Sequence, residues 1–121
     1  MMDTNNPVIQ LCIQGTQAEY ARQPEQAAHF YLRAWETAKT DYERCIAAHY
    51  LARSQPSAHE VLRWNRLALQ HAQLVEDPEE VAAFLPSMYL ALGAALEAMG
   101  EIDEAQAFYQ LASQAGLNHS L

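Results

Sequence analysis

The sequence predicts an all-α protein of six helices that pair into three antiparallel hairpins. Apolar residues recur every three or four positions through most of the 121 residues, as expected for helices that bury one face. No segment alternates apolar and polar residues with a period of two, so we expect no β-sheet. Ala, Leu, Gln and Glu, which form helices well, are the most frequent residue types.

The segment from Tyr89 to Ala115 shows the helical pattern most clearly. Its first half carries apolar residues at helical spacing up to Met99, and Gly100 then interrupts the pattern. A second periodic run starts at Ala105. Glycine commonly ends a helix in a left-handed backbone conformation. We therefore expect two helices that fold back on each other around Gly100.

Start signals place the earlier helices in order. Asn6 followed by Pro7 combines a capping side chain with proline at the first helical position, and predicts a helix to about residue 21. Pro24 starts a second helix that reaches about residue 39. Thr40 and Glu43 form a capping box that opens a third helix, to about residue 53.

A second capping box, Ser57 with Glu60, opens a fourth helix that extends to about residue 75. After the fifth helix, the sixth follows Gly100 and is expected to end at Gly116, a C-terminal cap.

The fifth helix contains a proline. Its apolar positions continue from Val81 to Leu92 through Pro86, which favours one helix over residues 78–99. Pro86 should kink that helix, because it removes one backbone hydrogen bond and crowds the preceding turn. The alternative is a break at Leu85, with a separate short helix before it.

The hairpins share an internal repeat. In the first and third copies, glycine precedes an Ala-x3-Tyr-x2-Ala motif by twelve residues: Gly15 with Ala27, Tyr31 and Ala34, and Gly93 with Ala105, Tyr109 and Ala112. The middle copy has His49, Val61, Asn65 and Ala68 at these positions. Ala27 and Val61 are 34 residues apart, whereas Val61 and Ala105 are 44 apart. The ten extra residues fall near the turn between the fourth and fifth helices.

This motif and its spacing of 34 residues resemble the tetratricopeptide repeat (TPR), a helix–turn–helix unit. The resemblance covers about residues 8–115 and implies a right-handed α-α superhelix. Three repeats are expected within one domain, at approximately residues 8–41, 42–85 and 86–116. The chain looks like the small stand-alone bacterial proteins of this repeat class.

Charge and composition bound the function. The chain has 15 acidic residues and 7 Lys or Arg residues, for a formal charge of −8, which disfavours nucleic acids and anionic membranes. No apolar run approaches the ~18 residues of a membrane-spanning helix. The N-terminus shows no signal-peptide pattern, so we expect a cytoplasmic protein. Cys12 and Cys45 match no metal or redox spacing and should be free thiols.

In the proteins that this chain resembles, the first helix of each repeat lines a concave groove that binds a peptide. The resemblance assigns to this groove Cys12, Thr16, Glu19, Tyr20, Glu43, Ile46, Tyr50, Arg53, Ser87, Leu90, Ala94 and Glu97. The lysines with which one subgroup clamps a C-terminal carboxylate are absent. The mixture of aromatic, aliphatic and acidic side chains favours an apolar peptide that carries basic groups.

His49 and Asn65 depart from the outer copies, where glycine and tyrosine occupy these positions. The small residue has become large and the large residue small, which indicates a compensating exchange between the third and fourth helices. Neither polar group should be buried without a partner. We therefore predict a His49–Asn65 hydrogen bond, direct or through water. A second hypothesis is that the pair shapes a pocket with Tyr50 and Arg53.

These observations predict a non-enzymatic protein–protein interaction module, with no catalytic residues and no cofactor. Cys45 and His49 lie one helical turn apart, but no third ligand is near in sequence, so we expect no metal site. One alternative function is a small-ligand sensor or enzyme that uses His49, Tyr50 and Arg53. Another is a structural homodimer scaffold.

Self-association is expected from uncovered apolar residues at two places. No capping helix follows the sixth helix, which would leave Phe108, Leu111 and Leu117 partly uncovered. The inserted segment adds Val81, Phe84 and Leu85 as a second apolar patch. A symmetric homodimer is the commonest way to cover such surfaces.

Overall fold

The computed structural model describes the backbone of residues 4–120 and the side chains of residues 4–116. Within residues 4–120 the regular elements are helices, and no strand occurs. They are α1 (Pro7–Tyr20), α2 (Pro24–Thr37), α3 (Asp41–Ala52), α4 (Ala58–Leu74), α5 (Glu79–Ala82), α6 (Leu85–Ala98) and α7 (Ile102–Ser120). The all-α prediction is confirmed for this range, with seven helices in place of six.

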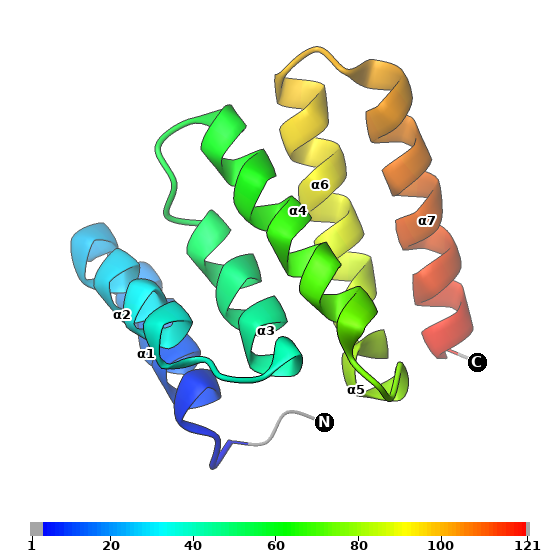
Figure 1. Cartoon of the computed structure of the whole chain (residues 1–121). Coiled ribbons are helices and arrows are strands. Elements are labelled where there is room, and N and C mark those ends of the chain that lie inside the picture. The colour runs from blue at the N-terminus through cyan, green and yellow to red at the C-terminus, as the bar shows by residue number, and fades with distance from the viewer. Residues whose placement is uncertain (1–3, 121) are drawn as a thin grey trace.

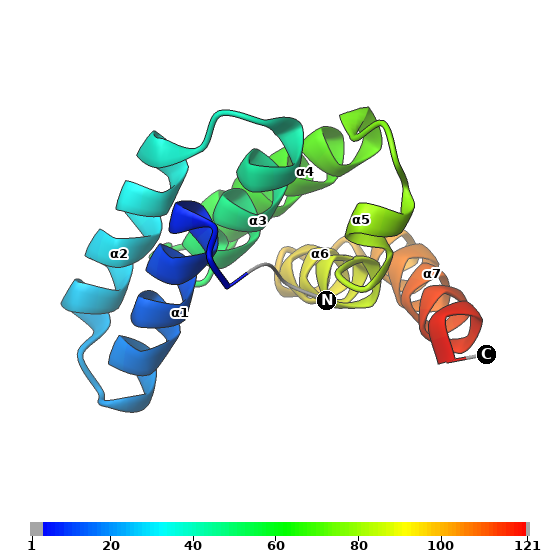
Figure 2. The ribbon, with the colours of Figure 1, turned by 90° about the horizontal axis from the view of Figure 1, so that it is seen from below.

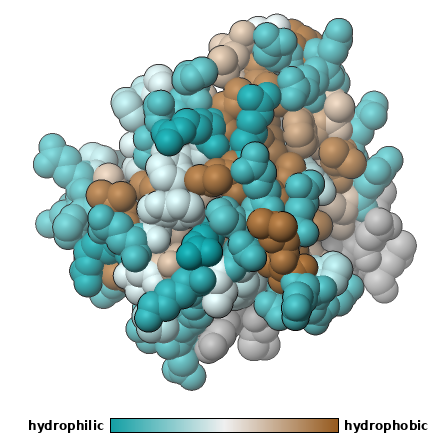
Figure 3. Space-filling view, viewed as in Figure 1, coloured by the Kyte–Doolittle hydropathy of each residue, from teal (hydrophilic) through white to brown (hydrophobic). Residues whose placement is uncertain are grey.

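The helices pack in three successive pairs: α1 with α2, α3 with α4, and α6 with α7 (Figure 1). The pairs are joined by contacts of α2 with α3 and of α4 with α6. Seen from below, the pairs follow one another across the molecule, and the short α5 lies at one end of α6 (Figure 2). Hydrophilic side chains cover most of the face in Figure 3, and hydrophobic ones show mainly along α4 and α6.

The predicted helix starts are confirmed where a capping side chain was identified. The Asn6 carboxamide oxygen accepts hydrogen bonds from the backbone N–H groups of Val8 and Ile9. Thr40 and Glu43 form the reciprocal capping box at the start of α3. The hydroxyl of Ser57 accepts from the backbone N–H of Glu60, 3.2 Å away, at the start of α4. These side chains satisfy N–H groups that have no partner within the helix.

The expected kinked helix over residues 78–99 is wrong, and the alternative of a separate short helix is correct. The backbone N–H of Phe84 bonds to the Val81 carbonyl at 2.9 Å, and α6 begins at Leu85. Pro86 therefore lies in the first turn of α6, where its missing N–H has no helical partner to lose. A break before Pro86 avoids the lost hydrogen bond that a continuous helix would require.

Left-handed residues end two of the helices. Gly100 has φ 83°, as predicted, and the N–H of Glu101 returns to the Leu96 carbonyl at 2.9 Å. Arg22 has φ 59° at the equivalent place after α1, an unusual conformation for a residue with a side chain. The predicted end at Gly116 is wrong, because α7 continues to Ser120. Glycine costs only about 1 kcal/mol inside a helix, so one glycine without a left-handed turn does not end it.

The repeated glycines and tyrosines pack against each other. The ring of Tyr31 lies where a Cβ atom on Gly15 would be, and the ring of Tyr109 does the same at Gly93. Any larger residue at either glycine would displace the ring. This contact explains why glycine and tyrosine occur together in the first and third copies.

The inserted segment faces inward, which corrects the expectation of a second apolar patch. Val81 is buried, and Phe84 and Leu85 pack against the core residues beneath them. The short α5 makes this possible, because its break from α6 allows these side chains to turn toward α3 and α4. Phe108, Leu111 and Leu117 on the last helix were expected to be partly uncovered. The side chain of Leu117 lies outside the described residues.

Candidate functional site

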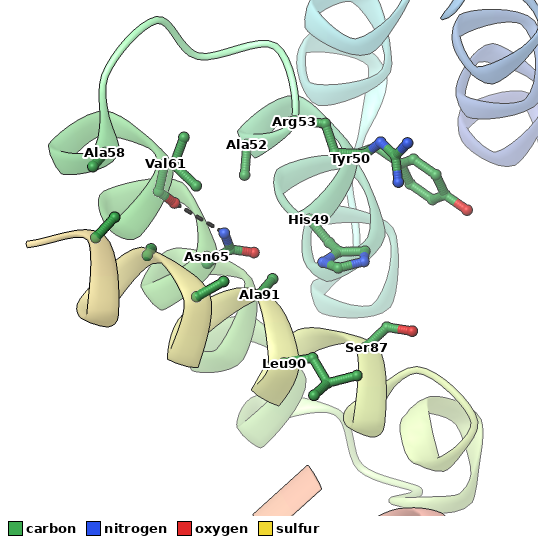
Figure 4. A pocket seen from close by; sticks show the side chains of 13 residues that line it. His49, Tyr50, Ala52, Arg53, Ala58, Val61, Asn65, Ser87, Leu90 and Ala91 are labelled. Carbon is green, nitrogen blue, oxygen red and sulfur yellow. Dashed lines mark hydrogen bonds between the residues drawn. The ribbon is translucent and has the colours of Figure 1, made fainter. Parts of the chain in front are cut away.

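A cavity of about 570 Å³ lies between α3, α4 and α6 (Figure 4). Six of its thirteen lining residues are alanines, and these short side chains leave the space open. Most of the polar lining comes from the middle copy of the repeat, with His49, Tyr50 and Arg53 from the end of α3 and Asn65 from α4. Ser87 on α6 completes it. The volume falls in the range of small-ligand and side-chain binding sites.

Two buried polar atoms of residues that line this cavity have no hydrogen-bond partner among the described residues. Asn65 is only 1% exposed, and its amide nitrogen donates to the Val61 carbonyl at 3.0 Å. Its amide oxygen Oδ1 and the ring nitrogen Nδ1 of His49 are unpaired. The predicted direct hydrogen bond does not form with regular geometry, although the Asn65 amide is close enough to affect the pKa of His49, and the alternative through water stays a prediction. A buried polar atom without a partner costs about 1–3 kcal/mol.

His49 is neutral in this environment. Burial lowers the pKa of its imidazole below 6.5, and the positive charge of Arg53 adds to this effect. The nearby Asn65 amide opposes the shift without reversing it. A neutral imidazole has one nitrogen that donates and one that accepts. Nδ1 of His49 can therefore take either role toward a ligand.

Arg53 connects the cavity to the first helix pair. Its Nε and Nη2 atoms donate to the two carboxylate oxygens of Glu19, at 3.0 and 2.8 Å. Glu19 also accepts a hydrogen bond from the hydroxyl of Tyr31. The hydrogen bonds from Arg53 hold the pKa of Glu19 below its usual value. The Arg53 side chain is 52% exposed, so this ion pair mainly fixes the position of the guanidinium group.

Part of the predicted groove comes together at the cavity. Tyr50 and Arg53 from the end of α3 line it, as do Ser87 and Leu90 on α6. Ala94, which the resemblance also assigned to the groove, lies on the same wall. Figure 4 shows Ser87 and Leu90 across the cavity from His49.

Two predicted groove residues have structural roles instead. Ile46 is 1% exposed and packs in the core, so it cannot contact a ligand. The carboxylate of Glu43 accepts from the backbone N–H groups of Lys39 and Thr40 and from the Asn6 amide. It therefore caps α3 at the end of the helix away from the cavity.

The remaining predicted residues do not line the cavity. Thr16 donates to the Cys12 carbonyl at 3.0 Å, and Cys12 is buried. Tyr20 is exposed on the last turn of α1. Glu97 accepts from the Tyr109 hydroxyl at 3.0 Å, which repeats the contact of Glu19 with Tyr31.

Sequence reasoning missed the alanine wall of the cavity. Ala91, Ala94, Ala95 and Ala98 on α6 follow a helical spacing, and all four line the cavity. The signal was present as a stripe of small residues opposite His49 and Asn65. It was not decisive, because the same stripe is expected where two helices pack closely.

Both cysteines are buried. Burial raises the pKa of both Cys12 and Cys45 to about 12, so neither is a thiolate at neutral pH. The described residues contain no cluster of three or more His, Cys, Asp or Glu side chains suited to a metal ion. None of the helices in the described range is both long and apolar enough to span a bilayer.

Comparison of the chain with protein-family models, curated proteins and solved structures finds no match.

Proposed function

We propose that this protein is a non-enzymatic interaction module that binds a partner protein by taking one of its side chains into the cavity between α3, α4 and α6. The observation that carries the proposal is a cavity with two unpaired buried polar atoms, on Asn65 and His49. Buried polar atoms in proteins are nearly always paired. A ligand that supplies the missing hydrogen bonds would be favoured because it removes this deficit.

The residues that flank the cavity support a peptide rather than an isolated small molecule. Leu90 is 52% exposed and the Arg53 side chain is equally exposed, and both line the cavity while facing solvent. They would contact the residues on either side of an inserted side chain. A buried anchor surrounded by such contacts is typical of protein interfaces. The formal charge of −8 favours a partner with basic flanking residues.

The proposal assumes the TPR-like right-handed superhelix, with α1, α3 and α6 facing the partner. The three successive helix pairs and the repeated glycine–tyrosine contact support this arrangement. The cytoplasmic location and the absence of a nucleic-acid partner stay predictions from the sequence.

The test is a selection of displayed random peptides on the wild-type protein, followed by calorimetric measurement of their affinities. The decisive variant is His49→Gly with Asn65→Tyr, called here the plugged variant. It transfers the glycine–tyrosine pair of the outer copies into the middle copy, so a tyrosine ring of the protein itself would occupy the site. We expect the selected peptides to bind this variant at least ~10-fold more weakly.

The matched control is His29→Ala, because His29 is exposed on α2 and distant in the fold from the cavity. It should bind the peptides as the wild type does. Equal affinity for the plugged variant and the wild type would place the binding site elsewhere. Failure to select any peptide would reject the peptide-binding proposal.

A further inference from the structure

The outer copies of the repeat show how this protein packs a phenol ring. Tyr31 lies over Gly15 and Tyr109 lies over Gly93. Each hydroxyl bonds to a glutamate four residues after the glycine, Tyr31 to Glu19 and Tyr109 to Glu97. The same tyrosine environment is thus built twice, with the ring against backbone and the hydroxyl on a polar acceptor.

At the junction between the first two helix pairs, this ring is part of an aromatic pair. Tyr31 packs against Tyr50 of the next pair, with ring centroids 5.7 Å apart. The equivalent positions at the second junction are Asn65 and Ala94, because Ala94 follows Gly93 as Tyr50 follows His49. Both rings are therefore missing at the second junction.

The cavity occupies the place of these missing rings. Asn65 and Ala94 both line it, from α4 and α6 respectively. His49, which replaces the glycine, fills part of the space with its imidazole, and about 570 Å³ stays open beside it. Figure 4 shows that the Asn65 amide directs its nitrogen to Val61 and its oxygen toward the His49 side of the cavity.

The two unpaired atoms select for a neutral group that can donate a hydrogen bond. The amide nitrogen of Asn65 already donates to Val61, so its unpaired oxygen needs a donor. A carboxylate or a phosphate dianion has no proton to donate. An ammonium group is disfavoured, because it would lie beside the positive charge of Arg53 and the lining contains no carboxylate to pair with it. A hydroxyl can donate its single proton to Asn65 and accept a hydrogen bond from His49 Nδ1 in the tautomer that carries a proton on this nitrogen.

We propose that the cavity is a phenol-binding site, and that its ligand is a tyrosine side chain of the partner protein. The ring would lie against the alanines of α6, including Ala94. Because Oδ1 of Asn65 and Nδ1 of His49 are both covered in the structure, the His49 ring would have to turn aside before the hydroxyl reaches them. The inference rests on the proposed function, and it adds the identity of the inserted side chain.

The first experiment uses p-cresol, the side chain of tyrosine, as the probe. Isotope-labelled protein is titrated with p-cresol, toluene and 4-methylanisole, and binding is followed by NMR shifts of the Asn65 side-chain amide and of Ala94. Toluene lacks the hydroxyl, and 4-methylanisole keeps the oxygen but has no proton to donate. We expect p-cresol to bind about tenfold more tightly than either, the effect of one net hydrogen bond. Equal binding of the three compounds, or no binding of p-cresol, would overturn the inference.

Variants separate hydrogen bonding from shape. Asn65→Leu removes the acceptor at similar size and also removes a buried unpaired atom, so the variant should fold. Its preference for p-cresol over toluene should be smaller than that of the wild type, because only His49 Nδ1 is left to pair with the hydroxyl. The plugged variant should bind neither compound, whereas His29→Ala should behave as the wild type. A preference for p-cresol that is undiminished in Asn65→Leu would contradict the assigned hydrogen bond to Asn65.

Peptide experiments distinguish failure of this inference from failure of the proposed function. Peptides selected on the wild type should contain tyrosine, and replacing it by phenylalanine should weaken binding about tenfold. Replacing it by phosphotyrosine should weaken binding further, because the phosphate has no proton for Asn65. Cavity-dependent peptides that need no tyrosine would overturn this inference and leave the proposed function intact. Binding of p-cresol without binding of any peptide would support phenol recognition and would overturn the proposal that the ligand belongs to a partner protein.

Discussion

Arg22 and Gly100 occupy equivalent places after the first helix of their repeats, and both have a positive φ. A side chain makes this conformation costly, whereas glycine adopts it freely. We therefore predict that Arg22→Gly stabilises the protein by about 0.5–1 kcal/mol. This is the backbone strain that glycine relieves minus the conformational entropy that glycine adds to the unfolded chain. Urea denaturation measures the change in the free energy of unfolding.

The control is Arg33→Gly, because Arg33 is exposed within α2, where the backbone is helical. That change should destabilise the protein by about 1 kcal/mol. A loss of stability in both variants would show that the side chain of Arg22 contributes more than its backbone strain removes.

The lowered pKa of His49 makes stability depend on pH. The unfolded chain takes up a proton at this imidazole near pH 6.5, whereas burial opposes protonation in the folded state. The stabilising contribution is complete above pH 6.5 and is lost as the pH falls toward the lowered pKa. The free energy of unfolding should therefore drop as the pH falls below about 6.5.

The comparison is with His49→Gln, which keeps the other histidines in place. This variant should lose less stability over the same interval, since the remaining titrating groups are common to both proteins. The Glu19 carboxyl, whose pKa is lowered by Arg53, protonates only at lower pH. Equal losses in wild type and variant would mean that His49 is not desolvated in solution.

At the scale of the elements, Pro86 decides how the inserted segment folds. It lies in the first turn of α6, where proline costs the helix no hydrogen bond. We predict that Pro86→Ala changes the free energy of unfolding by less than ~1 kcal/mol. A proline inside a continuous helix would behave differently, and its replacement would stabilise the protein by about 3 kcal/mol.

Ala107→Pro supplies the contrast, because Ala107 is exposed in the interior of α7. This change should cost about 3 kcal/mol or more. Thermal and urea denaturation of both variants give the two numbers. A large stabilisation by Pro86→Ala would indicate that the segment favours the continuous helix in solution.

Helix starts could be predicted from the sequence because caps are local. Asn6, Thr40 and Ser57 each act on N–H groups two or three residues ahead, so their effect can be read without the fold. The break before Pro86 could not be chosen, because the apolar spacing continues on both sides of it. The packing of Val81 and Phe84 against other helices favours the break over the continuous helix. The end of α7 was missed for a simpler reason, since Gly116 is compatible with both a cap and a helix.

At the scale of the whole molecule, the cavity depends on residues from three helices. The unusual pair His49 and Asn65 was identified from the repeat register. The volumes of these two side chains did not show whether they fill the space that glycine and tyrosine occupy in the outer copies. Ala94 was the missing information, because its short side chain faces the same space from α6. The prediction that Ile46 and Glu43 face the groove was wrong, because the position of a residue in a repeat does not show whether it is buried or caps a helix.

The homodimer stays a prediction, and it now rests on the last helix. Ile102 and Leu111 on α7 are 50% and 41% exposed. We expect sedimentation equilibrium at micromolar concentration to give a dimer mass, and the double change Ile102→Glu with Leu111→Glu to give a monomer. A monomer mass for the wild type would reject the prediction.

The cavity as the binding site is tested most directly by mapping the contacts of a selected peptide on labelled protein. NMR titration reports each backbone amide and the side-chain amide of Asn65 separately. The account predicts the largest shifts at Asn65, Ala94 and Leu90, and their disappearance in the plugged variant. Shifts confined to other surfaces, such as the hollow beside Arg22 and Ser54, with Asn65 and Ala94 unchanged, would contradict it.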